Sequence, residues 1–288
     1  METKPLIEFG KRTYVMGILN VTPDSFSGDG LLSRENTVRA ALDQAQRYVE
    51  AGVDILDIGG ESTRPGSSLV DEAEELSRVL PVIDALRGSG ITTLVSIDTY
   101  KAAVAEAALD HGADWINDVW ALRADPHMAE VAAMRKVPII LMHNRSKPDH
   151  IALEQRLGGS YLGSVYADLI GDVRGELMES VAIARAAGVE DNRVILDPGI
   201  GFGKTVEQNL ELVNRLGEIR NLGFPVLLGA SRKSFIGYTL DLPPAERVEG
   251  TAAVCAVGIA RGADIIRVHD VEVMVRVARM TDAIVRSH

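Results

Sequence analysis

Short apolar runs recur along the chain, and longer segments with a helical pattern separate them. The runs are rich in β-branched residues and predict eight buried strands, which begin near Tyr14, Val53, Thr92, Asp114, Val137, Arg193, Phe224 and Asp264. The intervening segments place apolar residues on one helical face, as in Val38, Ala41, Leu42, Ala45, Tyr48 and Val49, or in Val248, Ala252, Cys255 and Ile259. The pattern therefore predicts strands and helices that alternate along the sequence.

Glycines mark the places where a predicted helix gives way to a strand. The same phrase appears as A-G-V-D-I-L-D-I at Ala51, H-G-A-D-W-I-N-D-V at His111 and R-G-A-D-I-I-R-V at Arg261. Glycine tolerates the left-handed conformation that ends many helices. A signal for the start of a helix agrees with this interpretation, because Thr205 and Gln208 have the spacing of a capping box.

The order of the predicted elements favours one α/β architecture. Alternating strands and helices favour a parallel sheet, and eight such units favour a closed (β/α)8 TIM barrel. An open, doubly wound sheet is the alternative. No linker or shift in composition divides the chain, so we expect a single domain over residues 1–288. The polar stretch from Asn144 to Ser160 is predicted to be a loop after the fifth strand.

Composition and charge narrow the possible partners. The formal net charge is −11, which argues against a general attraction to nucleic acid or to an anionic membrane. An anionic ligand would need a local basic cluster. The one cysteine, Cys255, excludes an intramolecular disulfide. The first residues lack the apolar core of a signal peptide, and no apolar run is long enough to span a bilayer. We therefore expect a soluble cytoplasmic protein.

Polar residues follow every predicted strand, at the end where barrels of this kind build their active sites. In chain order they are Asn20; Asp57 with Glu61, Thr63 and Arg64; Asp98; Asn117 with Asp118; His143 with Asn144; Asp197; Ser231 with Arg232 and Lys233; and Arg267 with His269. One such residue is usually a cap or a turn former, but a set after all eight strands predicts a ring around one mouth. We interpret Asp57, Asp118 and Arg232 as structural supports of that ring.

Two loops carry aromatic side chains among turn formers. Phe26 lies in the polar loop that follows the first strand, where it either closes over a ligand or packs as a hydrophobic peg. The stretch D-P-G-I-G-F-G-K-T is not a P-loop, because Pro198 stands where a glycine is required. Nor is it a dinucleotide fingerprint, because Lys204 replaces the third glycine. Its glycines instead predict a tight loop that presents Phe202. No sequence pattern of a preformed zinc site is present.

Several longer motifs occur in a fixed order. They are G-I-L-N-V-T-P-D-S-F-S, D-I-G-G-E-S-T-R-P-G, S-I-D-T, I-N-D-V, L-M-H-N, I-L-D-P-G-I-G-F-G-K, G-A-S-R-K-S-F-I-G and I-I-R-V-H-D-V. With them the chain resembles bacterial dihydropteroate synthases over essentially its whole length, although S-G-D-G at Ser27 departs from the more common S-D-G-G. The resemblance implies a transferase of folate biosynthesis that condenses 6-hydroxymethyl-7,8-dihydropterin diphosphate with 4-aminobenzoate. It also implies a (β/α)8 barrel, Mg²⁺ as cofactor, a homodimer and inhibition by sulfonamides.

The resemblance also implies roles for individual residues. The pterin would be bound by Asp98, Asn117, Asp197, Lys233 and Arg267, and the catalytic residues would be Asp98, Asp197, Lys233 and Arg267. The diphosphate would be bound by Asn20, Thr63, Arg64, Arg267 and His269, with Asn20 as the metal ligand. The aminobenzoate would be bound by Phe26, Thr63, Pro65, Phe202, Ser231 and Lys233. Carboxylates and an amide suit the N–H edge of a pterin, and a lysine suits its acceptors.

Two other classes share part of this pattern. A pterin-binding methyltransferase barrel would use the same two aspartates and asparagine, but it has no use for the S-R-K and R-V-H elements together with Asn20. A non-catalytic pterin-binding paralogue would keep Asp98, Asn117 and Asp197 but lose the motifs of the first two loops, which are intact in this sequence.

Overall fold

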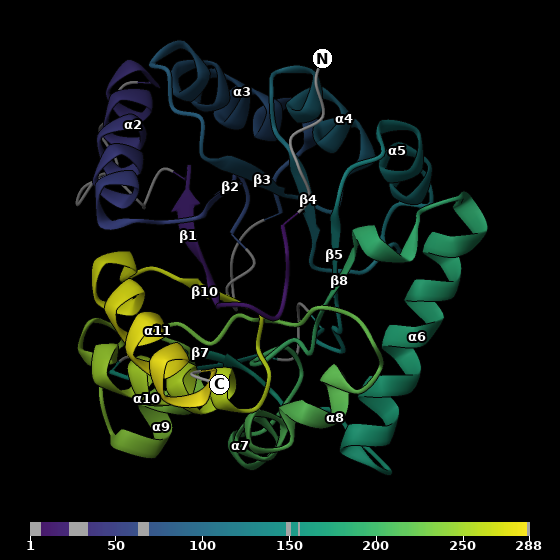
Figure 1. The fold of residues 1–288 in the computed structure, drawn as a ribbon, viewed down its shortest axis with the longest axis vertical. Helices are drawn as coiled ribbons and strands as arrows, with labels where there is room; N and C mark the ends of the chain where they lie inside the picture. The colour runs from purple at the N-terminus through teal and green to yellow at the C-terminus, as the bar shows by residue number, and fades with distance from the viewer. Residues whose placement is uncertain (1–6, 23–33, 63–68, 148–150, 155, 287–288) are drawn as a thin grey trace.

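The computed structural model describes residues 7–22, 34–62, 69–147, 151–154 and 156–286 (Figure 1). Within them, parallel strands form an eight-stranded sheet in the order β8-β5-β4-β3-β2-β1-β10-β9. Their bounds are β1 (Tyr14–Asn20), β2 (Ile55–Gly59), β3 (Leu94–Asp98), β4 (Trp115–Asp118), β5 (Ile139–Met142), β8 (Val194–Asp197), β9 (Leu227–Leu228) and β10 (Ile265–Val268). A parallel bridge from Leu196 in β8 to Val226 before β9 closes the sheet, so the predicted barrel is confirmed.

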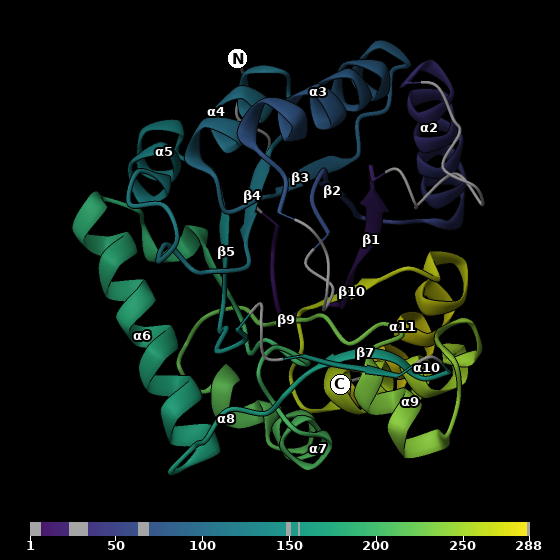
Figure 2. The same cartoon turned by 180° about the vertical axis from the view of Figure 1, so that it is seen from behind.

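Helices lie around the outside of the strands in both views of the molecule (Figures 1 and 2). Their bounds are α2 (Arg34–Ala51), α3 (Glu72–Gly88), α4 (Ala102–Asp110), α5 (Met128–Arg135), α6 (Leu169–Ala187), α7 (Val206–Asn214), α8 (Leu216–Arg220), α9 (Ser234–Leu240), α10 (Val248–Ala260) and α11 (Val271–Val285), with short 3₁₀ turns at Asp191–Arg193 and Pro244–Glu246. Among the described residues, no helix is both long enough and apolar enough to cross a membrane.

The helix signals in the sequence correspond to observed caps and faces. The glycines of the repeated phrase, Gly52, Gly112 and Gly262, have φ values of 91°, 108° and 103° and so adopt the left-handed conformation. At the start of α7, the Thr205 hydroxyl accepts from the Gln208 N–H, and the Gln208 side chain accepts from the Thr205 N–H. The predicted capping box is therefore present.

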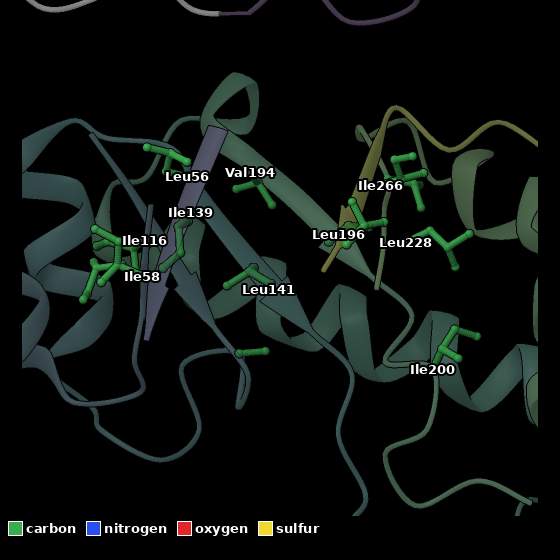
Figure 3. Packing of buried hydrophobic residues seen from close by; sticks show 14 of the residues in the cluster. Leu56, Ile58, Ile116, Ile139, Leu141, Val194, Leu196, Ile200, Leu228 and Ile266 are labelled. Atoms are coloured by element: carbon green, nitrogen blue, oxygen red, sulfur yellow. The ribbon is translucent and has the colours of Figure 1, made fainter. Parts of the chain in front are cut away.

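Two apolar layers hold the barrel together. Inside it, one cluster joins Met16, Ile55, Trp115, Ile140, Ile195, Leu227 and Ile265, each from a different strand. Outside it, the intervening strand residues pack against the helices, and Figure 3 shows Ile58, Ile139 and Leu196 among them. From the helix side, Ala41 and Ala45 of α2 are fully buried, as the predicted face requires, whereas Val49 at its edge is 37% exposed.

Most of residues 144–160, which the sequence predicts to be a loop after the fifth strand, belong to a segment that forms an antiparallel hairpin ending at Tyr161. Its strands are β6 (Ile151–Glu154) and β7 (Gly158–Tyr161). Each strand has four residues, too few to show an alternating pattern in the sequence. Contacts with distant parts of the chain fix the hairpin instead: Arg247 donates to the Leu157 carbonyl over 2.7 Å, and Tyr161 stacks on Phe202.

Candidate active site

The alternation of strand side chains places the polar residues directly above the inner apolar layer. Residues two positions apart on a strand point to the same side. Counting two positions on from that layer reaches Asp57, Asn117, Asp197 and Arg267, and counting four reaches Asn20 and His269. Asp98 stands in the same upper position on β3, four residues after Leu94, which packs against the inner layer. The barrel therefore stacks these side chains at its C-terminal mouth.

Arg267 connects carboxylates from two other strands. Its Nε lies 2.5 Å from Asp57 Oδ2, and its Nη2 lies 2.5 Å from Asp98 Oδ2. Asn117 donates from Nδ2 to the same Asp57 oxygen over 3.1 Å. The other oxygen, Asp57 Oδ1, is buried and has no hydrogen-bond partner among the described residues. The cluster thus leaves a buried acceptor within a ring of polar groups, an arrangement that suits a ligand with N–H donors.

Burial changes the protonation behaviour of this cluster. It raises the pKa of Asp98 to about 7, although the charge of Arg267 acts in the opposite direction. Burial lowers the pKa of Arg267, but the charges of Asp57 and Asp98 outweigh it and raise the value, so the guanidinium keeps its proton. A carboxyl group with a pKa near neutrality can act as donor or acceptor towards a bound heterocycle.

Asp197 and Lys233 form the opposite side of the site. Asp197 Oδ1 accepts from the Gly199 N–H over 2.7 Å, and burial raises its pKa against the charge of Lys233. Lys233 donates to the Ile200 carbonyl, and its Nζ lies 4.4 Å from the centre of the Phe202 ring. Burial lowers the pKa of Lys233 to about 8. The predicted lysine, aspartate and phenylalanine are therefore brought together.

The predicted diphosphate residues are only partly within the described chain. His269 Nδ1 lies 3.0 Å from Ser231 Oγ, and Tyr48 donates to the His269 carbonyl over 2.8 Å. Asn20 ends β1 opposite Gly59 of β2, at the same mouth. Four further predicted site residues lie outside the described residues; they are Phe26, Thr63, Arg64 and Pro65.

Two of the three predicted supports, Asp118 and Arg232, make contacts of the kind that such a role requires. Asp118 accepts backbone N–H groups of Trp120 and Leu122 over 2.9 and 2.6 Å, which shapes the chain after β4. Arg232 pairs with Asp270 and thereby joins the ends of β9 and β10. Asp57 differs from these two because it is itself part of the polar cluster, bonded to Arg267 and Asn117.

Sequence reasoning missed several buried polar residues around the site. Lys204 is 3% exposed, but the sequence analysis used it only to exclude a dinucleotide fingerprint. Lys101 pairs with Glu61 and Glu75 over 2.5 Å each, and Glu75 is itself 1% exposed. The available signal was a charged residue inside or beside an apolar or glycine-rich stretch, which requires a buried partner.

A match to the family described as pterin binding enzyme extends over residues 16–269. This chain belongs to the pterin binding enzymes. Within them it is 50% identical to the dihydropteroate synthase of Clostridium beijerinckii over 96% of each chain. The structure of the dihydropteroate synthase of Clostridium difficile in the presence of pteroic acid has a TM-score of 0.88 and 47% identity, and the match covers 98% of this chain and all of the other. The Xanthomonas albilineans dihydropteroate synthase with 4-aminobenzoic acid has a TM-score of 0.85 and 41% identity, with 95% and 93% covered. The closed barrel with its polar mouth is thus the scaffold of a pterin binding enzyme.

Proposed function

We propose that this chain is a dihydropteroate synthase, which joins 6-hydroxymethyl-7,8-dihydropterin diphosphate to 4-aminobenzoate and releases diphosphate. The observation that carries the proposal is the cluster of Asp57, Asp98, Asn117 and Arg267 above the apolar layer, with Asp197 and Lys233 on its other side. The relatives described above, at about 50% identity over nearly the whole chain, support it.

The pterin would lie against the buried carboxylates. Its edge presents N–H donors, which match Asp98, Asp197 and the buried Asp57 Oδ1 that lacks a partner among the described residues. Its carbonyl and ring nitrogen are acceptors, which match the Lys233 ammonium, while the Asn117 amide oxygen is a further acceptor for the N–H edge. A site built in this way rejects analogues without these groups, because its own buried groups would be left unpaired.

The diphosphate would extend towards the mouth. His269 and Arg267 supply positive or hydrogen-bonding groups there, and Arg64 of the second loop would add to them. Among the described residues, no group of three His, Cys, Asp or Glu side chains could hold a metal ion. Mg²⁺ usually takes one or two protein oxygens together with phosphate and water, so the Asn20 amide oxygen is a suitable ligand. When bound, the ion would neutralise charge on the leaving group.

The reaction exchanges one bond for another at the pterin methylene carbon. The C–O bond to diphosphate breaks and its electron pair leaves with the diphosphate, so positive charge develops on the methylene and the electron-rich ring. The Asp98 and Asp197 carboxylates stabilise that charge. The amino nitrogen of 4-aminobenzoate then forms the C–N bond and releases a proton to water. The product is 7,8-dihydropteroate.

The second substrate would bind nearer the surface. Phe202 offers an apolar ring, and Lys233 with Ser231 offers groups for a carboxylate. The first two loops would complete this pocket through Phe26, Thr63 and Pro65. We expect a cytoplasmic homodimer. Exposed apolar side chains on α10 and α11, which pack against each other, support the dimer: Val257, Met280 and Ile284 are 45%, 63% and 64% exposed.

A direct assay tests the proposed activity. Purified protein is mixed with both substrates, with and without Mg²⁺, and dihydropteroate and diphosphate are measured. We expect equal amounts of the two products, and we expect the reaction to require the metal. A protein that binds a plain pterin but forms no product with Mg²⁺ would instead be a non-catalytic paralogue or a methyltransferase barrel.

A binding experiment tests the role of the first two loops. If diphosphate orders the pocket for the second substrate, a sulfonamide should bind more tightly to protein saturated with pterin once diphosphate and Mg²⁺ are added, by about 1–3 kcal/mol. Equal affinity under both conditions would remove the coupling from the proposal and leave Phe26 as a packing residue.

A further inference from the structure

The loop between β8 and α7 packs directly against the backbone that follows β5. Gly199 has a φ of 68°, and a Cβ there would lie 1.8 Å from the His143 carbonyl oxygen. Gly203 has a φ of 66°, and a Cβ there would lie 2.6 Å from the Arg145 carbonyl carbon. Only glycine permits this close approach in this conformation. Phe202 belongs to this loop, so the position of the loop backbone determines where the Phe202 ring lies.

The buried Lys204 side chain donates hydrogen bonds to backbone carbonyls of this loop. Its Nζ donates to the Gly199 carbonyl over 2.8 Å and to the Phe202 carbonyl over 3.1 Å. The same Nζ lies 3.0 Å from His143 Nδ1. A lysine ammonium has three N–H donors, and these three acceptors use all of them. One buried side chain thus joins two turns of the loop to the end of β5.

The buried surroundings of His143 keep its ring neutral, so that its Nδ1 can accept a hydrogen bond. Burial, followed by the charge of Lys204, lowers the pKa of His143 to about 2, so the ring is neutral and its Nδ1 can accept. Its Nε2 lies 3.1 Å from Glu176 Oε2 of α6 without forming a hydrogen bond. Burial and the charge of Lys233 lower the pKa of Lys204 to about 7, while Asp197 and Glu176 act against them. Burying the Lys204 charge costs desolvation free energy, which its contacts with three acceptors offset in part.

We propose that Lys204 is a positioning residue for the aminobenzoate subsite, and that it acts by fixing the backbone on which Phe202 is presented. The proposal rests on the proposed function. The Phe202 ring contacts the Lys233 ammonium, 4.4 Å from the ring centre, and the Tyr161 ring, at a centroid distance of 5.9 Å. A shift of the Phe202 carbonyl would move one wall of the pocket. The pterin site would be affected less, because Asp57, Asp98 and Arg267 come from other strands, and of the pterin residues in the described chain only Asp197 and Lys233 are bonded to this loop.

The test separates the two substrates. Lys204→Met keeps the length of the side chain and removes its donors. We expect the KM for 4-aminobenzoate to rise about tenfold or more, because the loop loses the three Lys204 contacts that fix the backbone of Phe202. The Kd of 6-hydroxymethylpterin, measured by calorimetry, should change less than about threefold. Lys204→Gln retains N–H donors and should recover part of the lost affinity. Lys147→Met, at an exposed lysine after β5, is the matched control and should behave as the wild type.

Two results would overturn the inference. An unchanged aminobenzoate KM in Lys204→Met, or an equal loss of affinity for both ligands, would make Lys204 a support of the fold. If the Met variant does not fold, the same comparison is made with Lys204→Gln. The wild type is assayed first under the same conditions: no dihydropteroate from it would defeat the proposed function, whereas product formation with an unaltered variant KM would defeat only the role of Lys204.

Discussion

Replacing Asp57 by alanine tests whether the polar cluster is held together by one buried carboxylate. Asp57 is fully buried and accepts from Arg267 over 2.5 Å and from Asn117 over 3.1 Å. Both bonds end on the carboxylate, and a hydrogen bond to a charged group contributes about 1.5–3 kcal/mol. The two together give about 3–6 kcal/mol. Because Arg267 keeps its contact with Asp98, and because burying the carboxylate is itself unfavourable, we expect a loss near the lower limit, about 3 kcal/mol.

Two measurements check this value. A loss of about 3 kcal/mol should lower the melting temperature by roughly 6–12 °C in a protein of this size. Pterin binding should weaken by about tenfold or more, since the pterin loses the Asp57 Oδ1 acceptor and Asn117 and Arg267 lose the group that orients them. Asp57→Asn keeps the shape and one acceptor but removes the charge, so its effect on both quantities should be intermediate.

Ser96 provides a matched control for the Asp57 variant. It pairs with Asp57 in the sheet register, is fully buried, and its hydroxyl oxygen has no hydrogen-bond partner among the described residues. Ser96→Ala therefore removes a buried polar atom from the same place without breaking an observed contact. If Asp57→Ala changes the melting temperature and the pterin affinity no more than Ser96→Ala does, the cluster does not depend on Asp57 and the reasoning is wrong.

Three further predictions concern the other residues of the site. Asp98→Ala and Asp197→Ala should each weaken binding of a plain pterin by about 1–3 kcal/mol, measured by calorimetry, because substrate N–H groups lose buried partners; unchanged affinity in both would remove them from the pterin site. His269→Ala and Asn20→Ala should raise the KM for the diphosphate substrate while leaving plain pterin binding unchanged, and an equal loss for both ligands would contradict a phosphate and metal role. Since burial lowers the pKa of Lys233 to about 8, the lysine is charged below that pH and neutral above it. Pterin affinity of the wild type should therefore fall as pH rises through about 8, and subtracting the profile of Lys233→Met, which retains the titrations of the ligand and of Asp98, should isolate this fall.

The sequence by itself determined the parts of the molecule that depend on local pattern. Apolar runs located all eight strands to within three residues, because a strand buried on both faces needs a continuous apolar stretch. The glycines at 52, 112 and 262 marked helix ends, because their backbone conformation is unfavourable for other residues. The motifs after each strand also predicted which side chains would gather at the mouth, since every strand of a parallel barrel ends on the same side.

Only the tertiary structure decided how those side chains pair and how deeply they are buried. Arg267 meets Asp57 and Asp98 across 210 and 169 residues of sequence, and the barrel register that joins them has no local signature. The hairpin of β6 and β7, predicted as a loop, depends on a contact from Arg247. Lys204 looked like a departure from a glycine motif, but its three acceptors come from a folded loop and a neighbouring strand. Hydrogen bonds and desolvation depend on distance in space, and spacing along a chain reports that distance only within a single helix, strand or turn.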